Sequence, residues 1–108
     1  MKWMKDLYVG ESIKNQAHRI KWKVNHNAGT INVYLITFPS NPNNMLDIIP
    51  ARELLQKSYP KNNLKIIGIA SGWQESVELV SSIIEEAYNV MGTVDVYKYL
   101  KEYRRVEA

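Results

Sequence analysis

The feature that most constrains the fold is a short apolar segment followed at once by an amphipathic one, over residues 64–92. The first part, residues 64–70, is apolar except at Lys65 and Gly68, a pattern typical of a strand covered on both faces. Residues 71–74 then have the S-x-x-Q pattern of a capping box. Apolar residues recur at helical spacing until Gly92, namely Val77, Val80, Ile84, Ala87 and Met91. We therefore predict a strand at 64–70 and a helix at 73–91.

A strictly alternating segment at residues 19–24 predicts one strand of a hairpin. Its apolar face consists of Ile20, Trp22 and Val24, and its other face of Arg19, Lys21 and Lys23. Residues 31–38 are rich in β-branched and aromatic residues and supply the second strand. A loop at residues 26–29 places Trp22 opposite Val33 and Ile20 opposite Leu35. This register sets every apolar side chain of the first strand against an apolar partner.

Residues 48–58 predict a helix, with Asp47 as its N-cap and Pro50 in its first turn. Between strands at 31–38 and 64–70, such a helix makes a parallel βαβ unit with a right-handed crossover.

The two ends of the chain add smaller elements. Residues 7–9 predict a short edge strand, and Asp95 predicts the cap of a last helix that carries Val96, Tyr99, Leu100 and Tyr103.

These elements predict an α/β fold of the α+β kind, a small two-layer sandwich formed by one domain over residues 1–108. Its mixed sheet has three or four strands, built from the N-terminal hairpin and the parallel βαβ unit, and carries two to three helices. The two main helices are expected to cover the face that bears Ile20, Trp22, Val33 and Leu35.

Composition sets limits on the chemistry of the chain. With 108 residues of which 45% are hydrophobic, it has enough apolar material for one core. It has no cysteine, which excludes disulfides, thiolate catalysis and cysteine-based metal sites. The first residues lead into no apolar run, and no segment approaches the roughly 20 residues that span a bilayer. We therefore expect a cytoplasmic protein without a membrane partner, and we predict no cofactor.

The net charge of +3 is distributed unevenly. Residues 1–26 contain six Lys or Arg residues and two acidic residues, a balance of +4. Residues 71–108 contain four Lys or Arg residues and seven acidic residues, a balance of −3. Such polarity could steer an anionic partner to the N-terminal half, although solvated surface charge is the simpler interpretation.

Several short segments resemble a family of short uncharacterised bacterial proteins of about this length. They are Gly10-Glu11-Ser12-Ile13-Lys14-Asn15, Trp22-Lys23, His26-Asn27-Ala28-Gly29, Leu46-Asp47-Ile48 and Ile67-Gly68-Ile69-Ala70. The resemblance covers nearly the whole chain. It implies no activity, ligand or catalytic residue.

The junction of the predicted strand and helix, at Ser71, Gly72 and Trp73, is a candidate anion site. Free N–H groups at the start of a helix bind phosphate or carboxylate, and the Ser71 hydroxyl could assist. The surrounding residues match neither a Walker loop nor a nucleophile elbow, so simple helix capping is the competing interpretation.

The cationic face of residues 19–24 is a candidate nucleic-acid surface. Arg19, Lys21 and Lys23 could follow phosphates, and Tyr34 beside Lys21 could stack on a base. Alternating cations are also typical of any solvent-facing strand.

The two histidines, His18 and His26, have no spacing typical of a metal site. His26 lies in the predicted hairpin loop, where it is an ordinary turn residue. We predict no metal site and no catalytic residue.

The second sheet face leads to the functional hypothesis that we favour. Its side chains would form a large apolar patch in water, namely Tyr34, Ile36, Phe38, Ile67 and Ile69. Either the C-terminal segment, through Val96, Tyr99, Leu100 and Tyr103, or another chain must cover them. We favour a non-enzymatic binding or interaction module that self-associates as a homodimer. A nucleic-acid-binding protein is the second class, and an enzyme that binds a small anion at Ser71 is the third.

Overall fold

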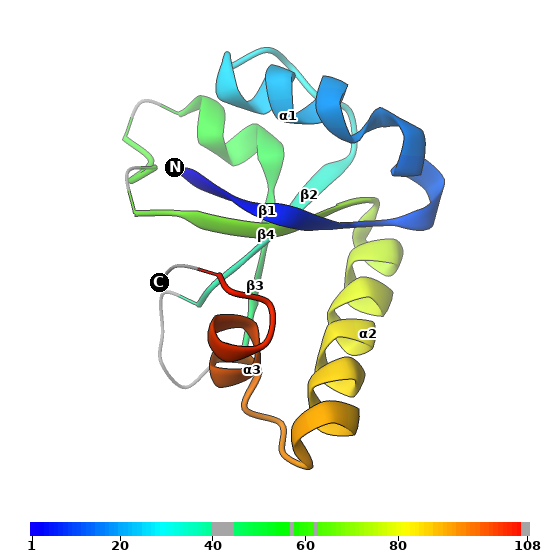
Figure 1. The fold of residues 1–108 in the computed structure, drawn as a ribbon. Helices are drawn as coiled ribbons and strands as arrows, with labels where there is room; N and C mark the ends of the chain where they lie inside the picture. Colours follow the sequence, from blue (N-terminus) through cyan, green and yellow to red (C-terminus); the bar gives the residue numbers. More distant parts are fainter. Residues whose placement is uncertain (40–44, 57, 62, 107–108) are drawn as a thin grey trace.

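The computed structural model describes residues 1–39, 45–56, 58–61 and 63–106 and contains one mixed sheet with helices on both faces (Figure 1). The strands are β1 (Lys2–Val9), β2 (Val33–Thr37), β3 (Asp47–Pro50) and β4 (Lys65–Ser71). The α-helices are α1 (Ala17–Asn25), α2 (Trp73–Met91) and α3 (Val96–Glu102), and the 3-10 segments are η1 (Glu11–Gln16) and η2 (Ala51–Leu55). The strand order is β1-β4-β2-β3, with β1 parallel to β4 and β2 antiparallel to both β4 and β3. The predicted small α+β fold with a mixed sheet is confirmed.

The strand and helix predicted from residues 64–92 are confirmed by β4 and α2. Gly92 ends α2 in the left-handed conformation, with φ of 74°, and its N–H donates to the Tyr88 carbonyl at 2.8 Å. The N-cap of α2 is Gly72, at φ of 81°, and no side chain caps it, so the predicted capping box around Ser71 is not formed. Neither α2 nor any other helix of the described residues is long and apolar enough to cross a bilayer.

The last helix, α3, starts where the sequence predicts. The Asp95 carboxylate accepts a hydrogen bond of 3.0 Å from the Lys98 N–H, which satisfies one of the free donors of the first turn.

The helices divide between the two faces of the sheet, which makes three layers rather than the predicted two (Figure 1). One face packs against α2 and α3, and its core includes Ile36, Ile67, Ile83 and Leu100. The other face packs against α1 and the 3-10 segments, and its core includes Ile20, Leu35, Leu54 and Ile66. Because the central strands β2 and β4 are apolar on both sides, both faces need a cover.

The predicted hairpin of residues 19–24 and 31–38 is wrong, because residues 17–25 form α1. Ile20 and Val24 are buried against the sheet, whereas Trp22 is 58% exposed and does not pair with Val33. The decisive pattern is an apolar stripe at spacings of four, three and four residues, made by Ile13, Ala17, Ile20 and Val24. This helical stripe extends over residues 13–24, whereas the strand-like alternation covers only residues 19–24, so the helical pattern is the longer of the two.

The predicted parallel βαβ unit is also wrong. Residues 47–50 form the edge strand β3, in which Ile48 lies opposite Ile36, and η2 follows in place of a longer helix. β2 and β4 are antiparallel, with Leu35 opposite Ile69. Two β-branched residues before Pro50 favour a strand, and a proline is tolerated at the end of an edge strand.

β1 is longer than the edge strand predicted at residues 7–9. It begins at Lys2 and pairs in parallel with β4. Lys5 and Asp6 in its middle are exposed, which interrupts the apolar pattern. An edge strand has a neighbour on one side only and tolerates such polar residues.

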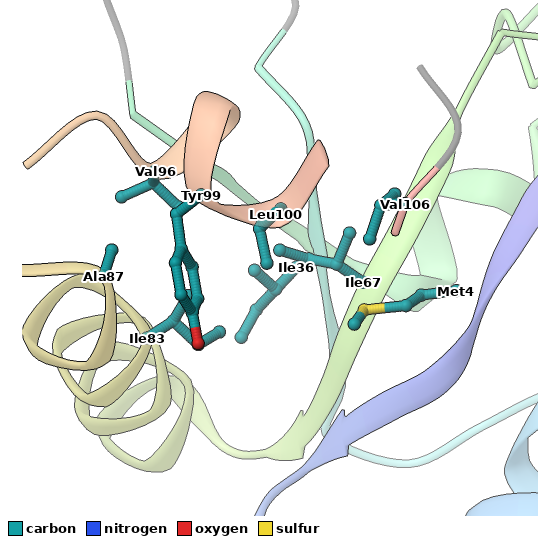
Figure 2. Packing of buried hydrophobic residues seen from close by; sticks show 9 residues of the cluster. All are labelled: Met4, Ile36, Ile67, Ile83, Ala87, Val96, Tyr99, Leu100 and Val106. Carbon is teal, nitrogen blue, oxygen red and sulfur yellow. The ribbon is translucent and has the colours of Figure 1, made fainter. Parts of the chain in front are cut away.

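The second sheet face is covered by the C-terminal segment of the same chain. In Figure 2, Leu100 of α3 lies over Ile36 and Ile67 of the sheet, and Tyr99 points toward Ile83 of α2. Ile36 and Ile67 are 0% exposed. Of the two covers that the sequence left open, the C-terminal segment and another chain, the structure shows the first over Ile36 and Ile67.

Ile69 lies on the opposite sheet face from Ile67, against our expectation. The cause is an irregularity in the pairing of β4 with β2, where Gly68 lies opposite Ile36 but Ile66 lies opposite Thr37. The extra residue shifts the alternation of β4 at this point.

Candidate functional site

Two neighbouring grooves open at the end of the sheet where β1 and β4 begin and β2 ends. The first, which we name the aromatic groove, has a volume of about 660 Å³ and is lined by residues that include Phe38, Tyr59 and Tyr97. Lys2 and Lys65 also line it. Its size and its largely apolar walls with a few polar groups are typical of small-ligand sites.

The second groove, which we name the cationic groove, has a volume of about 410 Å³. Its lining residues are Lys2, Trp3, Met4, Lys5, Lys65, Arg105 and Val106. Four of these residues are cationic and none is acidic. Lys2 and Lys65 line both grooves, so the two grooves adjoin at these residues and are treated as one candidate site.

Strand pairing places the two shared lysines side by side. Lys2 and Lys65 are paired residues of the parallel strands β1 and β4, and paired residues of neighbouring strands point to the same face. The Lys2 N–H donates to the Leu64 carbonyl at 2.8 Å, and the Phe38 N–H donates to the Lys65 carbonyl at 3.2 Å. These backbone hydrogen bonds therefore fix the positions from which the Lys2, Lys65 and Phe38 side chains project.

Charge differs between the two grooves. The aromatic groove contains the Asp47 side chain, and the pKa of Tyr59 is raised, first by burial and then by the Glu53 and Asp47 carboxylates. The cationic groove contains the four basic residues. A ligand with one neutral end and one negative end would place the negative end over Lys2 and Lys65.

The predicted anion site at Ser71, Gly72 and Trp73 holds a carboxylate of the chain itself. Glu75 Oε1 accepts a hydrogen bond of 2.8 Å from the Ser71 N–H, and its Oε2 accepts one of 3.1 Å from the Ser12 N–H. The Gly72 N–H donates to the Asn32 carbonyl at 2.7 Å. Burial acts to raise the pKa of Glu75, but the bonds from Ser71 and Ser12 outweigh it and lower the pKa.

The cations of the predicted nucleic-acid surface lie on a helix, not on a strand. Arg19, Lys21 and Lys23 belong to α1, where residues two apart point in different directions. Tyr34 is on the other face of the sheet, where its ring meets Trp73 of α2 at 6.0 Å between centroids. The structure therefore does not bring Tyr34 to the cations of α1.

The two histidines lie at opposite ends of α1, eight residues and about 12 Å apart along the helix axis. The His26 ring stacks on Trp22 with centroids 4.3 Å apart. Within the described residues there is no group of three or more His, Asp or Glu side chains that could hold a metal ion.

A second polar group, which we name the Glu86 cluster, consists of Tyr8, Glu86, Tyr99 and Arg104. Glu86 Oε2 accepts hydrogen bonds from the Tyr8 hydroxyl, from the Tyr99 hydroxyl at 2.7 Å and from Arg104 Nη1 at 3.1 Å. Arg104 also forms an ion pair with Asp6 at 3.0 Å. Burial acts to raise the pKa of Glu86, but the donors and the Arg104 charge outweigh it and lower the pKa. These groups satisfy one another, and they tie α2, α3 and the segment after it to β1.

No family model matches the chain, and neither the curated proteins nor the solved structures give a significant match. The resemblance to a family of short bacterial proteins therefore stays a prediction.

Sequence reasoning missed the site at the end of the sheet. Lys65 stands out only as an interruption of an apolar run, and Lys2 and Lys5 only as part of a basic N-terminal segment. The signal that could have joined them is the parallel pairing of β1 with β4, which connects residues far apart in the sequence.

Proposed function

We propose that the protein is a non-enzymatic binding module whose ligand carries negative charge and lies across the aromatic and cationic grooves. The observation that carries this proposal is the gathering of Lys2, Lys5, Lys65 and Arg105 around one groove, with no acidic residue among its described lining residues. Like charges brought together repel one another and disfavour the folded state. A bound anion would remove this repulsion.

The neighbouring aromatic groove supports a ligand with an apolar or aromatic part as well. Phe38, Tyr59 and Tyr97 line this groove together with the shared lysines. Contact with these rings supplies the apolar part of the binding free energy, and the lysines orient the charged part.

Calorimetric titration with tripolyphosphate tests the proposal. The wild-type protein should bind it with an affinity that falls as salt rises, and the K2A/K65A double variant should bind roughly ten- to thirtyfold more weakly. The matched control is K14A/R52A, which removes two exposed cations from η1 and η2. η1 and η2 follow the ends of β1 and β3, whereas the two grooves lie where these strands begin. Equal losses in both double variants would reduce the effect to net charge and refute the site.

Among the other sequence-based expectations, self-association loses the physical reason that we gave for it, whereas the anion-binding enzyme and the cytoplasmic location stay predictions. Self-association was expected because Ile36 and Ile67 needed a cover, and α3 now supplies that cover. An anion-binding enzyme at Ser71 would first have to displace the Glu75 carboxylate. The cytoplasmic location also stays a prediction.

A further inference from the structure

Building on the binding module proposed above, we propose that its ligand is a free amphiphilic anion, an alkyl chain that ends in a phosphate or carboxylate. The chain would lie in the aromatic groove, and the head group would lie over Lys2 and Lys65. Small-ligand sites commonly combine apolar walls with a few charged groups that orient the ligand.

Lys2 and Lys65 project from the sheet face that α2 and α3 cover. The residues that follow them, Trp3 and Ile66, are a strand pair and pack in the core beneath α1. Adjacent residues of a strand point to opposite faces, so both lysines point away from α1. The nucleic-acid partner that we expected at the cations of α1 therefore stays a separate prediction.

The aromatic groove reaches residues of both sheet faces. Tyr59 and Leu64 line it and pack against the core beneath α1, whereas Phe38 lines it and packs against the core beneath α2 and α3. Its other aliphatic lining residues are Pro39, Ile49 and Pro60. A ligand that follows this groove across the end of the sheet to the lysines must be elongated and largely apolar.

Charge sets the direction in which such a ligand binds. Asp47 is a lining residue of the aromatic groove, whereas the charged residues among the described lining of the cationic groove are Lys2, Lys5, Lys65 and Arg105. A negative head group is repelled by the carboxylate and attracted by the cations. The head group therefore lies at the lysines, and the uncharged chain passes Asp47.

The rings of the aromatic groove suit an alkyl chain better than a planar ring. Stacking needs a free ring face, but the Phe38 ring lies against Tyr97, with centroids 5.1 Å apart at an angle of 47°. Lys101 Nζ lies 5.4 Å from the centroid of the same Tyr97 ring. Hydrophobic contact is non-directional. An alkyl chain can thus bury apolar surface against these rings without a free face to stack on.

Calorimetric titration with a series from butyl to decyl phosphate, below their micelle concentrations, tests the inference. The affinity of the wild-type protein should rise roughly two- to fourfold with each added methylene, because a fully buried methylene contributes about fourfold and a groove buries it in part. Octyl glucoside, which has the same chain without the charge, should bind roughly tenfold more weakly than octyl phosphate. Naphthyl phosphate, whose apolar part is a rigid plane, should also bind more weakly than octyl phosphate.

Variants separate the contribution of the head group from that of the chain. K2A/K65A should weaken every alkyl phosphate roughly ten- to thirtyfold and leave the gain per methylene unchanged, whereas K14A/R52A should change neither. Tyr97→Ser should weaken octyl phosphate roughly three- to tenfold and leave tripolyphosphate binding unchanged, because it removes apolar wall and no charge. Tyr88→Ser is the matched control, since Tyr88 is an exposed tyrosine on α2 and is absent from the described lining of both grooves.

The outcomes distinguish this inference from the proposed function. An affinity that does not rise with chain length, together with tripolyphosphate binding that K2A/K65A abolishes, would overturn the amphiphile and leave the anion-binding module intact. Naphthyl phosphate bound as tightly as octyl phosphate would also overturn the alkyl chain.

Vesicles of phosphatidylcholine and phosphatidic acid distinguish a free amphiphile from a lipid held in a membrane. Binding to these vesicles without binding to the monomeric alkyl phosphates would overturn the inference. No binding of any alkyl phosphate or of tripolyphosphate would overturn both the inference and the proposed function. The comparisons among ligands need only the wild-type protein, so they do not depend on the folding of a variant.

Discussion

The hydroxyl of Tyr99 on α3 donates a hydrogen bond of 2.7 Å to the carboxylate of Glu86 on α2. This bond joins the two helices that cover one face of the sheet. The same carboxylate oxygen accepts from Tyr8 of β1 and from Arg104. One side chain therefore holds the C-terminal segment over the residues that would otherwise form an exposed apolar patch.

Glu86→Gln should destabilise the protein by about 1–3 kcal/mol, because it removes the charge that faces Arg104 and leaves three donors around a weaker acceptor. Urea unfolding of the two proteins measures the difference. The control is Glu85→Gln, an exposed neighbour on α2, for which we expect a change within about 0.5 kcal/mol. Equal losses at the two positions would show that the Glu86 cluster does not stabilise the fold.

Stability should fall in acid through Glu86 and Glu75. Both groups have a lowered pKa in the folded protein, against an ordinary value of 4.5. Their folded form binds protons less readily than the unfolded chain, so their contribution is present above about pH 4.5 and is lost as the pH falls further. Urea unfolding across this range should show a smaller pH dependence in Glu86→Gln and Glu75→Gln than in the wild type. An unchanged pH dependence in both variants would contradict the two shifts.

Stability should also fall in alkali, through Tyr8 and Tyr99. The pKa of each is raised above the ordinary value of 10.0, first by burial and then by the bond to Glu86 and its negative charge. The folded protein holds these protons more tightly than the unfolded chain, so the contribution is present below about pH 10 and is lost as the pH rises.

Tyrosinate absorbance between pH 9 and 12, read together with circular dichroism, checks this prediction. Part of the tyrosinate signal should appear only as the protein unfolds. That part should shrink in Tyr8→Phe and Tyr99→Phe. A titration of all seven tyrosines before unfolding would refute the prediction.

Local patterns predicted some elements well and failed where pairing decides the structure. β4, α2 and α3 carry their own signals, which are an apolar run, a helical stripe ending at Gly92 and the cap at Asp95. Residues 19–24 satisfy a strand pattern and a helical pattern at once, and only the stripe from Ile13 to Val24 decides between them. β3 is antiparallel to its partner β2, and no short segment of the sequence encodes this pairing.

The candidate site was harder to predict than the fold for the same reason. Lys2 and Lys65 become neighbours only through the parallel pairing of β1 and β4. The Glu75 carboxylate, in contrast, stands in the first turn of a predicted helix, where an acidic residue is expected to bind free N–H groups. The sequence showed that acid, but not that its carboxylate would accept hydrogen bonds from the Ser71 and Ser12 N–H groups.

Sedimentation at micromolar concentration should show a monomer, because the face with Ile36 and Ile67 is covered by Leu100 and its neighbours. Leu100→Ala should destabilise the fold by about 2–5 kcal/mol, since Leu100 is fully buried. Tyr103→Ala, at an exposed position after α3, is the control and should cost far less. A dimer in the wild type would instead support the self-association that we expected from the sequence.

Gly10 and Glu75 should be energetically coupled. A Cβ atom on Gly10 would overlap Glu75 Oε1 and would lie 2.6 Å from the Glu75 Cδ, so Gly10→Ala must push this carboxylate away from the Ser71 and Ser12 N–H groups. The backbone of Gly10, at φ of −60° and ψ of 144°, is one that alanine adopts without strain.

Gly10→Ala alone should therefore destabilise the protein by about 1–3 kcal/mol, the usual cost when hydrogen bonds to a carboxylate are lost. In a Glu75→Ala background the obstacle is absent, and the same substitution should be neutral or stabilise the fold by about 0.4–1 kcal/mol, because alanine restricts the unfolded chain. Urea unfolding of the four proteins of this double-mutant cycle measures the coupling, which should exceed about 1 kcal/mol. Gly29→Ala, at a position where a Cβ meets nothing within 4 Å, serves as the control and should show no coupling to Glu75→Ala. Additive effects of Gly10→Ala and Glu75→Ala would mean that the carboxylate does not occupy the start of α2 in the way that its bonds to Ser71 and Ser12 indicate.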